Sequence, residues 1–595
     1  MYQKYFQIPL AISNQGCLKE WIRHPLPRYF ISMSFEKCFF PKVPLLPEDL
    51  IPLIKKSPQL DCEQKWLDWA VCEKSFCYVK KNILDKEKDV KCTFIELLFN
   101  KGLGTYDGPF KKKVINYILQ ESDVVKVYCK SQTNAWSSVL VGFRNATFRN
   151  SESIPYTTFF GIPKNVLVIG FASVSRNTFI NKLPRTYEYL MNKLNGDVLQ
   201  GYNIVEDTDG FSLLYPFLTG KNKSELLNSG GYIDDFPFIW KEFKEREYIT
   251  AHIDDIALWN PPCGDPNFKF IPTDHYIQQY YINAREKLKF WPQFCSGSIP
   301  RHKIIFDYIR DFFTLYKNRR KFLFAFYSEI THSNFNRLDV IDEDLFILLK
   351  YLDGLNILRK TLLIIMSDKG FKFSSINDVL RMKQEEMSPF LYIRLPPIFS
   401  RRYPRHYMNF QKNIKGLVTP YDLHKTLKHM LDPDIYRESK RAISLFHHIP
   451  YPRSCFDAQI GSGLCACWIT KYTPDLVPFA PLMKDILEST LNNMSQPLRD
   501  KCEKMTVTTI TNITRIIPNS DLFRYTDDTY QFIITALVLP GYTLFEARVV
   551  YDKRIEKYLI NTEEITSFDY GLQSLCVKHD TKLRKFCYCR DQSLY

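Results

Sequence analysis

Val166-Leu-Val-Ile-Gly170 is a short, unbroken run of apolar residues followed by a polar turn. A continuous run of this kind is typical of a strand that is buried on both faces. Two more runs have the same character, Phe322-Leu-Phe-Ala-Phe-Tyr327 and Thr361-Leu-Leu-Ile-Ile-Met366. A fourth lies between Pro389 and Leu395. We predict a strand at each of these four places.

Helical patterns alternate with these strands. Apolar residues have helical spacing from Phe179 to Met191 and from Asp342 to Leu352. A third helix is predicted over Thr419 to Leu431, with Thr419 as its cap before Pro420. Strands alternating with helices predict an α/β fold with a mainly parallel sheet flanked by helices. Ligands bind beyond the carboxyl ends of such strands, so we expect a site in the loops that follow the first three.

At these loops the sequence resembles the animal family called domain of unknown function two-two-nine, a branch of the alkaline phosphatase/sulfatase superfamily. The order and spacing of many short matches carry the resemblance. They are Cys38-Phe-Phe-Pro-Lys-Val-Pro44, Asn165 to Arg176, Pro184-Arg-Thr-Tyr-Glu-Tyr-Leu190, Gly201-Tyr-Asn203, Pro216-Phe-Leu-Thr-Gly220, Thr331-His332, Met366-Ser-Asp-Lys-Gly370, Leu395-Pro-Pro397, Thr419-Pro-Tyr-Asp-Leu-His424 and Cys465-Ala-Cys467.

The resemblance implies an alkaline-phosphatase-like core over residues 161–445. A Cys-rich N-terminal region, 1–160, precedes it, and a Cys-bearing C-terminal region, 446–595, follows it. It also implies descent from enzymes that hydrolyse or transfer phosphate or sulfate esters. In that chemistry divalent metals polarise the ester, and a Ser, Thr or modified Cys attacks it.

The sequence departs from the family pattern at three of four expected positions. The family's first strand ends Gly-Ile-Asp-Ser-Val-Ser-Arg, with the Asp as a metal ligand, and here Ala172 replaces that Asp. Gly210 stands where the nucleophilic Thr is expected, counting back from Leu218-Thr-Gly220. Lys369 replaces the His of Ser-Asp-His-Gly, and only Asp368 remains as a metal ligand. Lys is a poor ligand because its ammonium must first lose a proton.

Two alternative interpretations of these departures remain open. A shift of register by one or two residues would let Thr208 or Ser212 replace the nucleophile. The Lys369 ammonium could also stand in for the metal as an ion-pair partner of Asp368, which requires its nitrogen to lie within salt-bridge reach of that carboxylate.

Three acidic or imidazole side chains near predicted strand ends are weaker candidates. Asp254 and Asp255 follow a probable strand and are candidates for a second cation site, although acidic pairs in loops are usually solvated or cap a helix. His332 follows the Phe322–Tyr327 strand as a candidate substrate or phosphate contact, or as a hydrogen-bonded loop residue.

The start of the first predicted helix offers a candidate anion site. Ser173 and Ser175 lie where backbone N–H groups favour anions, and helix capping explains them equally well. Arg176 is a candidate phosphate or sulfate contact, or the partner of a surface acid. His424 lies in a helical stretch, where packing is the commoner role.

The cysteines and sequons indicate an extracellular or secretory-pathway setting. Fourteen of the 16 Cys lie in the first and last quarters of the chain, which favours disulfides. The pairs Cys465-Ala-Cys467 and Cys587-Tyr-Cys589 have shorter spacing than zinc fingers do. Candidate glycosylation sites are Asn145, Asn222, Asn493 and Asn512. Residues 1–30 show no signal peptide, so we expect the start to omit a targeting segment.

Length and charge set further limits. The chain has 595 residues with 45% hydrophobic side chains, enough for a sizeable core in three or four units of roughly 100–200 residues. No apolar run reaches the 18 residues of a transmembrane segment. The net charge is +15, but the basic residues are scattered and no nucleic-acid motif is present. We therefore expect no nucleic-acid partner.

We interpret the chain as a pseudoenzyme that binds no cofactor and recognises anionic groups, such as sulfated or phosphorylated glycans, outside the cell. An active hydrolase with a rearranged site is the first alternative. It would use Ser173, Ser175 or Ser212 as nucleophile and a divalent metal held by Asp254, Asp255, Asp368 and His332. A purely structural or interaction protein is the second alternative.

Overall fold

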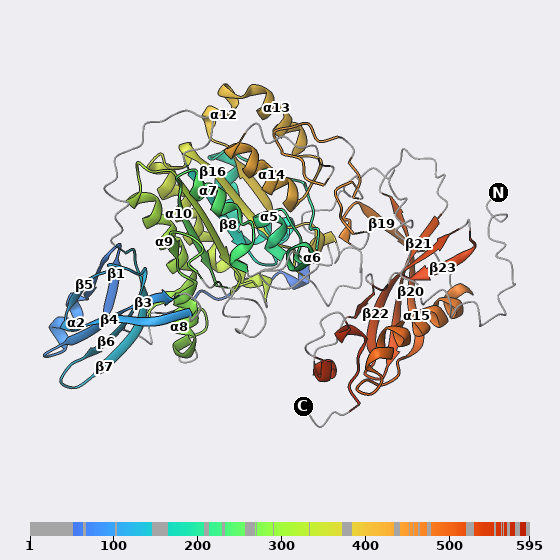
Figure 1. Cartoon of the computed structure of the whole chain (residues 1–595), viewed down its shortest axis with the longest axis horizontal. Helices are drawn as coiled ribbons and strands as arrows, with labels where there is room; N and C mark the ends of the chain where they lie inside the picture. The colour runs from blue at the N-terminus through green and yellow to red at the C-terminus, as the bar shows by residue number, and fades with distance from the viewer. Residues whose placement is uncertain are drawn as a thin grey trace. The chain divides into compact units, whose positions relative to one another are not determined.

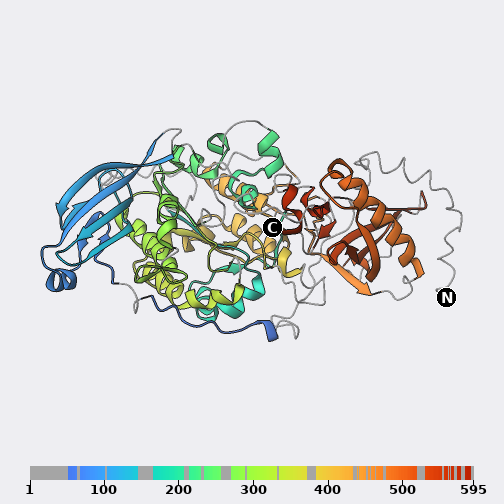
Figure 2. The same cartoon turned by 90° about the horizontal axis from the view of Figure 1, so that it is seen from below.

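The structure is a computed structural model, shown in Figures 1 and 2. It describes residues 51–62, 67–100, 104–144, 165–206, 213–228, 233–255, 268, 270–288, 291–331, 334–371, 384–432, 439, 441–450, 453–455, 457–461, 464–472, 478–518, 529–552, 555–560, 562, 565–567, 572–577 and 583–590. These residues form two compact units. The larger unit comprises those within 42–453 and 457–460, and the smaller one those at 454–455 and 461–590.

A seven-stranded sheet is the centre of the larger unit. The four predicted strands are all present, and the first three are parallel neighbours with the Val166 strand in the middle. The fourth strand pairs antiparallel to the third. In spatial order the strands are β12 (His275–Tyr276), β11 (Ile249–Asp254), β15 (Lys321–Tyr327), β8 (Asn165–Phe171), β16 (Thr361–Ser367), β17 (Leu391–Arg394) and β9 (Asp197–Val198).

Helices cover both faces of this sheet, as Figure 1 shows for α9 and α10 on one side of β8 and α5 and α14 on the other. One face packs against α3 (Arg176–Lys182), α4 (Pro184–Asn192), α8 (Gln278–Leu288), α9 (Arg301–Leu315) and α10 (Asp342–Gly354). The other packs against α5 (Tyr215–Thr219), α6 (Lys223–Asn228), α7 (Ile239–Glu245), α12 (Pro397–Arg402), α13 (Pro404–Asn413) and α14 (Pro420–Leu431).

Strand β8 explains why its sequence is apolar without interruption. Leu167 and Ile169 belong to the apolar cluster on one face of the sheet, while Val166 and Val168 belong to the cluster on the other. All seven residues of the strand are buried. The prediction of an α/β fold with a mainly parallel, helix-flanked sheet is confirmed.

The predicted helices are present with one difference. α14 begins after Thr419, whose side chain accepts a hydrogen bond from the backbone N–H of Asp422 as the cap that the sequence predicts. α10 covers the second predicted helix. The stretch from Phe179 to Met191 is two helices, because α3 ends at Lys182 and Pro184 opens α4. Proline lacks the N–H that a continuous helix would need at this position.

Two antiparallel sheets precede the central sheet in the larger unit. One has the order β1 (Ala70–Glu73), β2 (Phe76–Val79), β5 (Asn116–Ile118), and α2 (Lys81–Lys86) follows β2. The other has the order β4 (Gly104–Val114), β3 (Lys91–Asn100), β6 (Val124–Lys130), β7 (Ala135–Val141). Leu97, Val124 and Phe143 join the same apolar cluster as α8 and α9, so this sheet shares a core with the central one.

Short elements complete the larger unit. Two-stranded pairs are β10 (Gly201–Tyr202) with β18 (Leu417–Val418), and β13 (Cys295–Ser296) with β14 (Ile299–Pro300). The 3-10 helices are η2 (Ile51–Leu53), η5 (Ile233–Asp235), η7 (Phe335–Ile341) and η8 (Leu358–Lys360).

The smaller unit is an antiparallel sheet with one long helix, α15 (Ala480–Ser495), packed on it, drawn in orange in Figure 2. The sheet consists of β19 (Trp468–Tyr472), β20 (Thr506–Pro518), β21 (Thr529–Leu539), β22 (Thr543–Asp552) and β23 (Lys557–Ile560), with β24 (Thr566–Ser567) also paired to β22. The 3-10 helices are η11 (Gln496–Leu498), η13 (Leu572–Val577) and η14 (Arg584–Phe586).

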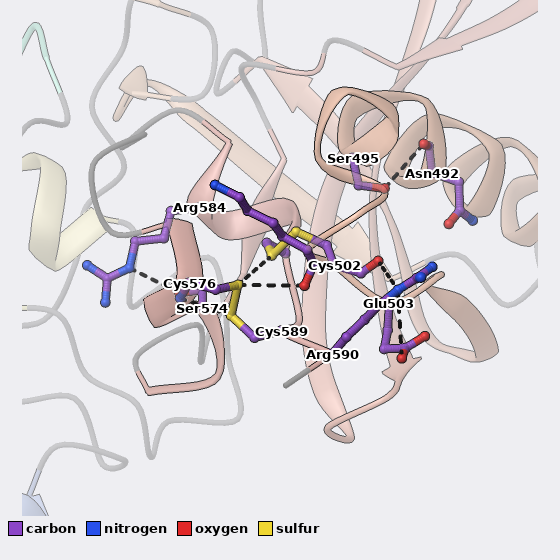
Figure 3. Close-up of a disulfide and its surroundings, with 11 residues drawn as sticks. Asn492, Ser495, Cys502, Glu503, Ser574, Cys576, Arg584, Cys589 and Arg590 are labelled. Atoms are coloured by element: carbon purple, nitrogen blue, oxygen red, sulfur yellow. Dashed lines mark hydrogen bonds and ion pairs between the residues drawn. A yellow bond between two sulfur atoms is a disulfide. The ribbon is translucent and has the colours of Figure 1, made fainter. Parts of the chain in front are cut away.

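Disulfides tie both flanking regions, as the cysteine distribution predicts. The larger unit contains Cys62–Cys295, Cys72–Cys77 and Cys92–Cys129. The smaller one contains Cys455–Cys465, Cys502–Cys587 and Cys576–Cys589. Figure 3 shows Cys576 bonded to Cys589 with Cys502 close by, and the Cys576 and Cys587 sulfurs are 3.7 Å apart.

No helix among the described residues is long and apolar enough to span a bilayer. The division of the chain at residues 160 and 445 stays a prediction.

Candidate functional site

The carboxyl ends of three parallel strands meet at one edge of the central sheet. Phe171, the last residue of β8, pairs with Tyr327 of β15 and with Ser367 of β16. The residues that follow, Ala172, Ser328 and Asp368, therefore begin adjacent loops, and β11 adds Asp254 and Asp255 at the same edge. This is the edge at which the sequence predicts a site.

Asp368 uses its carboxylate to hold two of these loops. Its Oδ1 accepts hydrogen bonds from the backbone N–H of Ser173 at 2.8 Å and of Lys369 at 2.7 Å. The Ser367 hydroxyl lies 3.3 Å from the same oxygen. Burial raises the pKa of Asp368, while these hydrogen bonds and the charge of Lys369 act in the opposite direction. The ion-pair role of the Lys369 ammonium stays a prediction.

Ala172 packs as a core residue. It is only 4% exposed and belongs to the apolar cluster on the α5–α14 face of the sheet. Its backbone N–H donates to the carbonyl of Tyr327 at 3.1 Å, and its carbonyl accepts from the Thr331 hydroxyl at 2.5 Å. Ala172 directly follows β8, as Asp368 directly follows the neighbouring strand β16, and it presents only a methyl group among apolar neighbours.

The loop from β8 to α3 engages most of its own backbone donors. The N–H of Ser173 bonds Asp368, and that of Val174 bonds the Ser367 hydroxyl at 2.9 Å. The N–H of Arg176 bonds the Ser388 carbonyl at 3.2 Å. Ser175 caps α3 by accepting from the N–H of Thr178 at 3.0 Å. Helix capping is therefore the observed role of Ser175.

Ser173 has an unusual backbone. Its φ of 58° lies in the left-handed region, which L residues other than Asn and Asp rarely adopt. The residue is 9% exposed, and the described part of the chain offers its hydroxyl no hydrogen-bond partner. A non-glycine residue held at positive φ beside a strand end is a common feature of functional loops.

Glu385 is a buried acid in this region that the sequence analysis does not identify. It accepts hydrogen bonds from the Ser175 hydroxyl and, at 2.6 Å, from the Asn177 amide. Burial lowers the pKa of Arg176, and the charge of Glu385 raises it. The Arg176 guanidinium donates to the carbonyl of Gln200 at 3.0 Å. No local pattern marks Glu385, because its partners lie about 210 residues earlier in the chain.

Asp254 and Asp255 have separate hydrogen-bond partners. Asp255 is fully buried and accepts from the N–H and the hydroxyl of Ser328, both at 2.7 Å, and from the N–H of Glu329 at 2.7 Å. Burial and the neighbouring Glu329 raise the pKa of Asp255 to about 7. Asp254 accepts from the Gln278 amide at 2.9 Å, and the His252 Nε2 lies 2.9 Å from its other oxygen. Asp255 therefore anchors the turn after β15.

Glu329 continues this buried network. Arg301 donates from Nε to one of its oxygens at 2.7 Å and from Nη2 to the other. Both side chains are buried, and the ion pair raises the pKa of Arg301 against the effect of burial. Asp255, which follows β11, therefore holds the loop after β15 by hydrogen bonds, and Glu329 in that loop pairs with Arg301.

The remaining candidates fall into three groups. Gly210, Thr208, Ser212, His332 and Asn145 lie outside the described residues. His424 is buried on α14, with Nδ1 2.9 Å from the Phe217 carbonyl, and burial lowers its pKa to about 3. Of the candidate glycosylation sites, Asn222 caps α6 by accepting from the N–H of Glu225 at 2.7 Å, Asn493 is exposed on α15, and Asn512 is partly buried in β20.

Among the residues that the structure describes, three groups of His or Cys bring their ligand atoms within 4.8 Å of one another. In two of them, Cys455 with Cys465 and Cys467, and Cys502 with Cys576 and Cys587, every cysteine is disulfide-bonded. Disulfide sulfurs are not the thiolates that bind metal. The third group is His406 on α13, His429 on α14 and His447 in the loop 441–450, and none of the three follows a strand of the central sheet.

The model of the family described as "Protein of unknown function (DUF229)" matches residues 55–511. No curated protein matches the chain. Among solved structures, the lipoteichoic acid synthase LtaP from Listeria monocytogenes is similar at 12% identity and a TM-score of 0.34, over 51% of this chain and 79% of that one. The phosphonate monoester hydrolase SpPMH from Silicibacter pomeroyi shares 10% identity at 0.34, over 66% and 89%. A protein of the alkaline phosphatase superfamily from Vibrio parahaemolyticus shares 12% identity at 0.34, over 68% and 83%.

Proposed function

The chain belongs to the DUF229 family, and from this premise we propose that it is a catalytically degenerate relative of metal-dependent phosphatases and sulfatases. Its role is to bind anionic groups outside the cell or in the secretory-pathway lumen. The observation that carries the proposal is that Ala172 and Asp368 directly follow Phe171 and Ser367, which pair at the ends of neighbouring strands. A divalent ion needs several oxygen or nitrogen donors at one point, and here the residue beside the carboxylate offers only a methyl group.

The neighbouring groups do not supply the missing donors. Lys369 carries an ammonium where an imidazole is expected, and a cation opposes metal binding. Asp255 already accepts three hydrogen bonds in its own loop. On this proposal the described residues at this edge do not form a donor set for a divalent ion, and no catalytic step is assigned to one.

Cationic side chains support the anion-binding role. Arg176 and Lys369 are partly exposed at the same edge of the sheet, and the chain as a whole carries a net charge of +15. Most of the backbone N–H groups of the β8–α3 loop are used internally, so contacts with a phosphate or sulfate would come from these side chains. The six disulfides that join described residues agree with an oxidising compartment.

The first test compares the natural chain with the triple variant Ala172→Asp, Gly210→Thr, Lys369→His, both secreted from cells. We expect no turnover of 4-nitrophenyl phosphate or 4-nitrophenyl sulfate by the natural chain and no loss of metal on Asp368→Asn. The triple variant is expected to gain a divalent ion that Asp368→Asn removes. Metal-dependent turnover by the natural chain that disappears on Asp368→Asn or Ser173→Ala would contradict the proposal and identify an active hydrolase.

The second test measures thermal unfolding with phosphate, sulfate or heparin, because a ligand that binds only the folded state stabilises it. We expect heparin to raise the Tm of the natural chain and the shift to shrink in Arg176→Ala and Lys369→Ala. Lys91→Ala, which removes an exposed cation far along the chain, is the matched control. An unchanged Tm with all three anions would favour a structural or interaction protein instead.

A further inference from the structure

His406, His429 and His447 come together from three separate segments of the larger unit. His406 lies in the first turn of α13, His429 in the last turn of α14, and His447 in the loop 441–450. The ring centroids of His429 and His447 are 4.5 Å apart, and those of His406 and His429 are 5.6 Å apart. Figure 1 shows α13 and α14, which supply the first two residues, in gold.

We propose that these three histidines form a zinc site, separate from the strand-end site and not required by the proposed function. One ring nitrogen from each residue lies within 4.8 Å of the other two. In a tetrahedral site with Zn–N bonds of about 2.1 Å, ligand nitrogens are about 3.4 Å apart. Rotation of the partly exposed His406 and His447 side chains closes that difference, and water takes the fourth position.

Hydrogen bonds already position two of the three residues. The Ser444 hydroxyl lies 2.9 Å from Nδ1 of His429, which leaves Nε2 of that ring for the ion. The buried Asn413 donates its amide to the carbonyls of Leu445 at 2.9 Å and His447 at 2.6 Å. The loop that carries His447 is thereby fixed to the C-terminal end of α13. Such second contacts are typical of metal-ligating histidines, which need a defined ring orientation.

A buried aromatic ring packs against two of the three histidines. Phe446 is 3% exposed, and its ring centroid lies 5.8 Å from that of His429 and 6.4 Å from that of His406. Asn409 donates to the Phe446 carbonyl at 2.9 Å, which ties the same loop to the middle of α13. His406 and His429 therefore pack against a buried aromatic ring, and the loop that carries His447 is held to α13 by hydrogen bonds.

The chemistry of the group selects among metals. Its members are three imidazoles with no carboxylate, which suits Zn²⁺, Cu²⁺ or Ni²⁺ and not Mg²⁺ or Ca²⁺. Neutral imidazoles are the form that binds metal. Two cationic side chains, Arg405 and Lys425, lie near the cluster. The same two cations repel a divalent ion and limit its affinity.

The test uses the full secreted chain, stripped with a chelator and titrated with Zn²⁺ by calorimetry. We expect one bound equivalent, an affinity lower by about 100-fold or more in His406→Ala, His429→Ala and His447→Ala, and no change in His448→Ala. His448 is the matched control because it is the exposed neighbour of His447 outside the cluster. Co²⁺ in place of zinc is expected to show the intense visible absorption of a tetrahedral site in the natural chain and in His448→Ala, and not in the three cluster variants.

Two readouts keep the test decisive if a variant folds poorly. Zn²⁺ is expected to raise the Tm of the natural chain and of His448→Ala, and not that of the more exposed variants His406→Ala and His447→Ala. Absence of Zn²⁺ binding, binding of Cu²⁺ without Zn²⁺, or full binding in His429→Ala would overturn the assignment. Zinc lost in Asp368→Asn but retained in His429→Ala would overturn both this site and the proposed function. Zinc retained in Asp368→Asn and lost in His429→Ala supports both.

Discussion

The backbone N–H of Ser173 donates a 2.8 Å hydrogen bond to the carboxylate of Asp368. This bond joins the loops that follow two adjacent parallel strands, β8 and β16. In an enzyme of the superfamily that the sequence resembles, a carboxylate at this place would hold a metal. Here it holds protein backbone, so a stability measurement reports on its present role.

Asp368→Ala is expected to lower the free energy of unfolding by about 1–3 kcal/mol. The substitution leaves the N–H groups of Ser173 and Lys369 without their acceptor, and unsatisfied buried donors carry that penalty. Urea unfolding followed by fluorescence measures the change. Asp107→Ala, at an exposed ion pair, is the control and should change stability by less than about 1 kcal/mol. Equal effects of the two substitutions would show that Asp368 does not hold the loops.

Ser173→Gly is expected to stabilise the chain by up to about 1 kcal/mol. Glycine adopts the φ of 58° without the steric penalty that Ser173 has, although it also adds entropy to the unfolded chain. Ser173→Val should destabilise it, since β-branched residues are strongly disfavoured at positive φ. The Tm values of the natural chain, Ser173→Gly and Ser173→Val, measured by thermal unfolding, test this order of stability. The prediction is wrong if the valine variant is as stable as the glycine variant.

Asp255 is expected to make folding less favourable as the pH rises. Its folded pKa is raised from 3.8 to about 7, so between these values the folded state holds a proton that the unfolded state has released. The contribution of Asp255 is complete below about pH 4 and is lost as the pH passes 7. About three pKa units at ~1.4 kcal/mol each give a change on the order of 4 kcal/mol.

The measurement is urea unfolding from pH 4.5 to 8 of the natural chain and of Asp255→Asn. The difference between the two proteins isolates this one group from all other titrations. We expect the free energy of unfolding of the natural chain to fall relative to that of Asp255→Asn as the pH rises. Asp89→Asn, at an exposed site, should give a flat difference, and a flat difference for Asp255→Asn as well would contradict the raised pKa.

Two disulfides between described residues close loops of very different length and should differ in their effect on stability. Cys62–Cys295 links residues 233 apart in sequence, and Cys72–Cys77 links residues only 5 apart. In the chain-entropy model their removal costs about 5 and about 2 kcal/mol. Double Cys→Ala variants compared by urea unfolding test this. A larger loss for the Cys72–Cys77 variant would show that strain or local structure, not loop closure, dominates.

Glu329→Gln is expected to destabilise the chain by about 3–5 kcal/mol, because it leaves Arg301 as a buried charge without its bidentate partner. Asp307→Asn breaks the exposed pair with Arg310 and should have an effect below about 1 kcal/mol. Calorimetric Tm values of both variants give the comparison. Similar shifts would mean that water reaches the Arg301 pair.

Much of the fold follows from local pattern. Uninterrupted apolar runs such as β8 have one stable solution, burial on both faces, and so the central strands and their helices are predicted correctly. The break between α3 and α4 was missed, although Pro184 marks it in the sequence. The antiparallel pairing of β17 was not predicted, because strand direction depends on how the chain returns to the sheet rather than on composition.

The candidate site divides in the same way. Which chemical groups are present and which are missing follows from the sequence, since Ala172 and Lys369 are identities that no fold can change. What the remaining groups touch follows only from how the chain folds. Asp368 accepts a hydrogen bond from the Ser173 backbone, and Glu385 accepts one from the hydroxyl of Ser175, 210 residues earlier in the chain. Three histidines from separate segments lie side by side. Such contacts depend on long-range chain packing, and sequence distance carries no information about them.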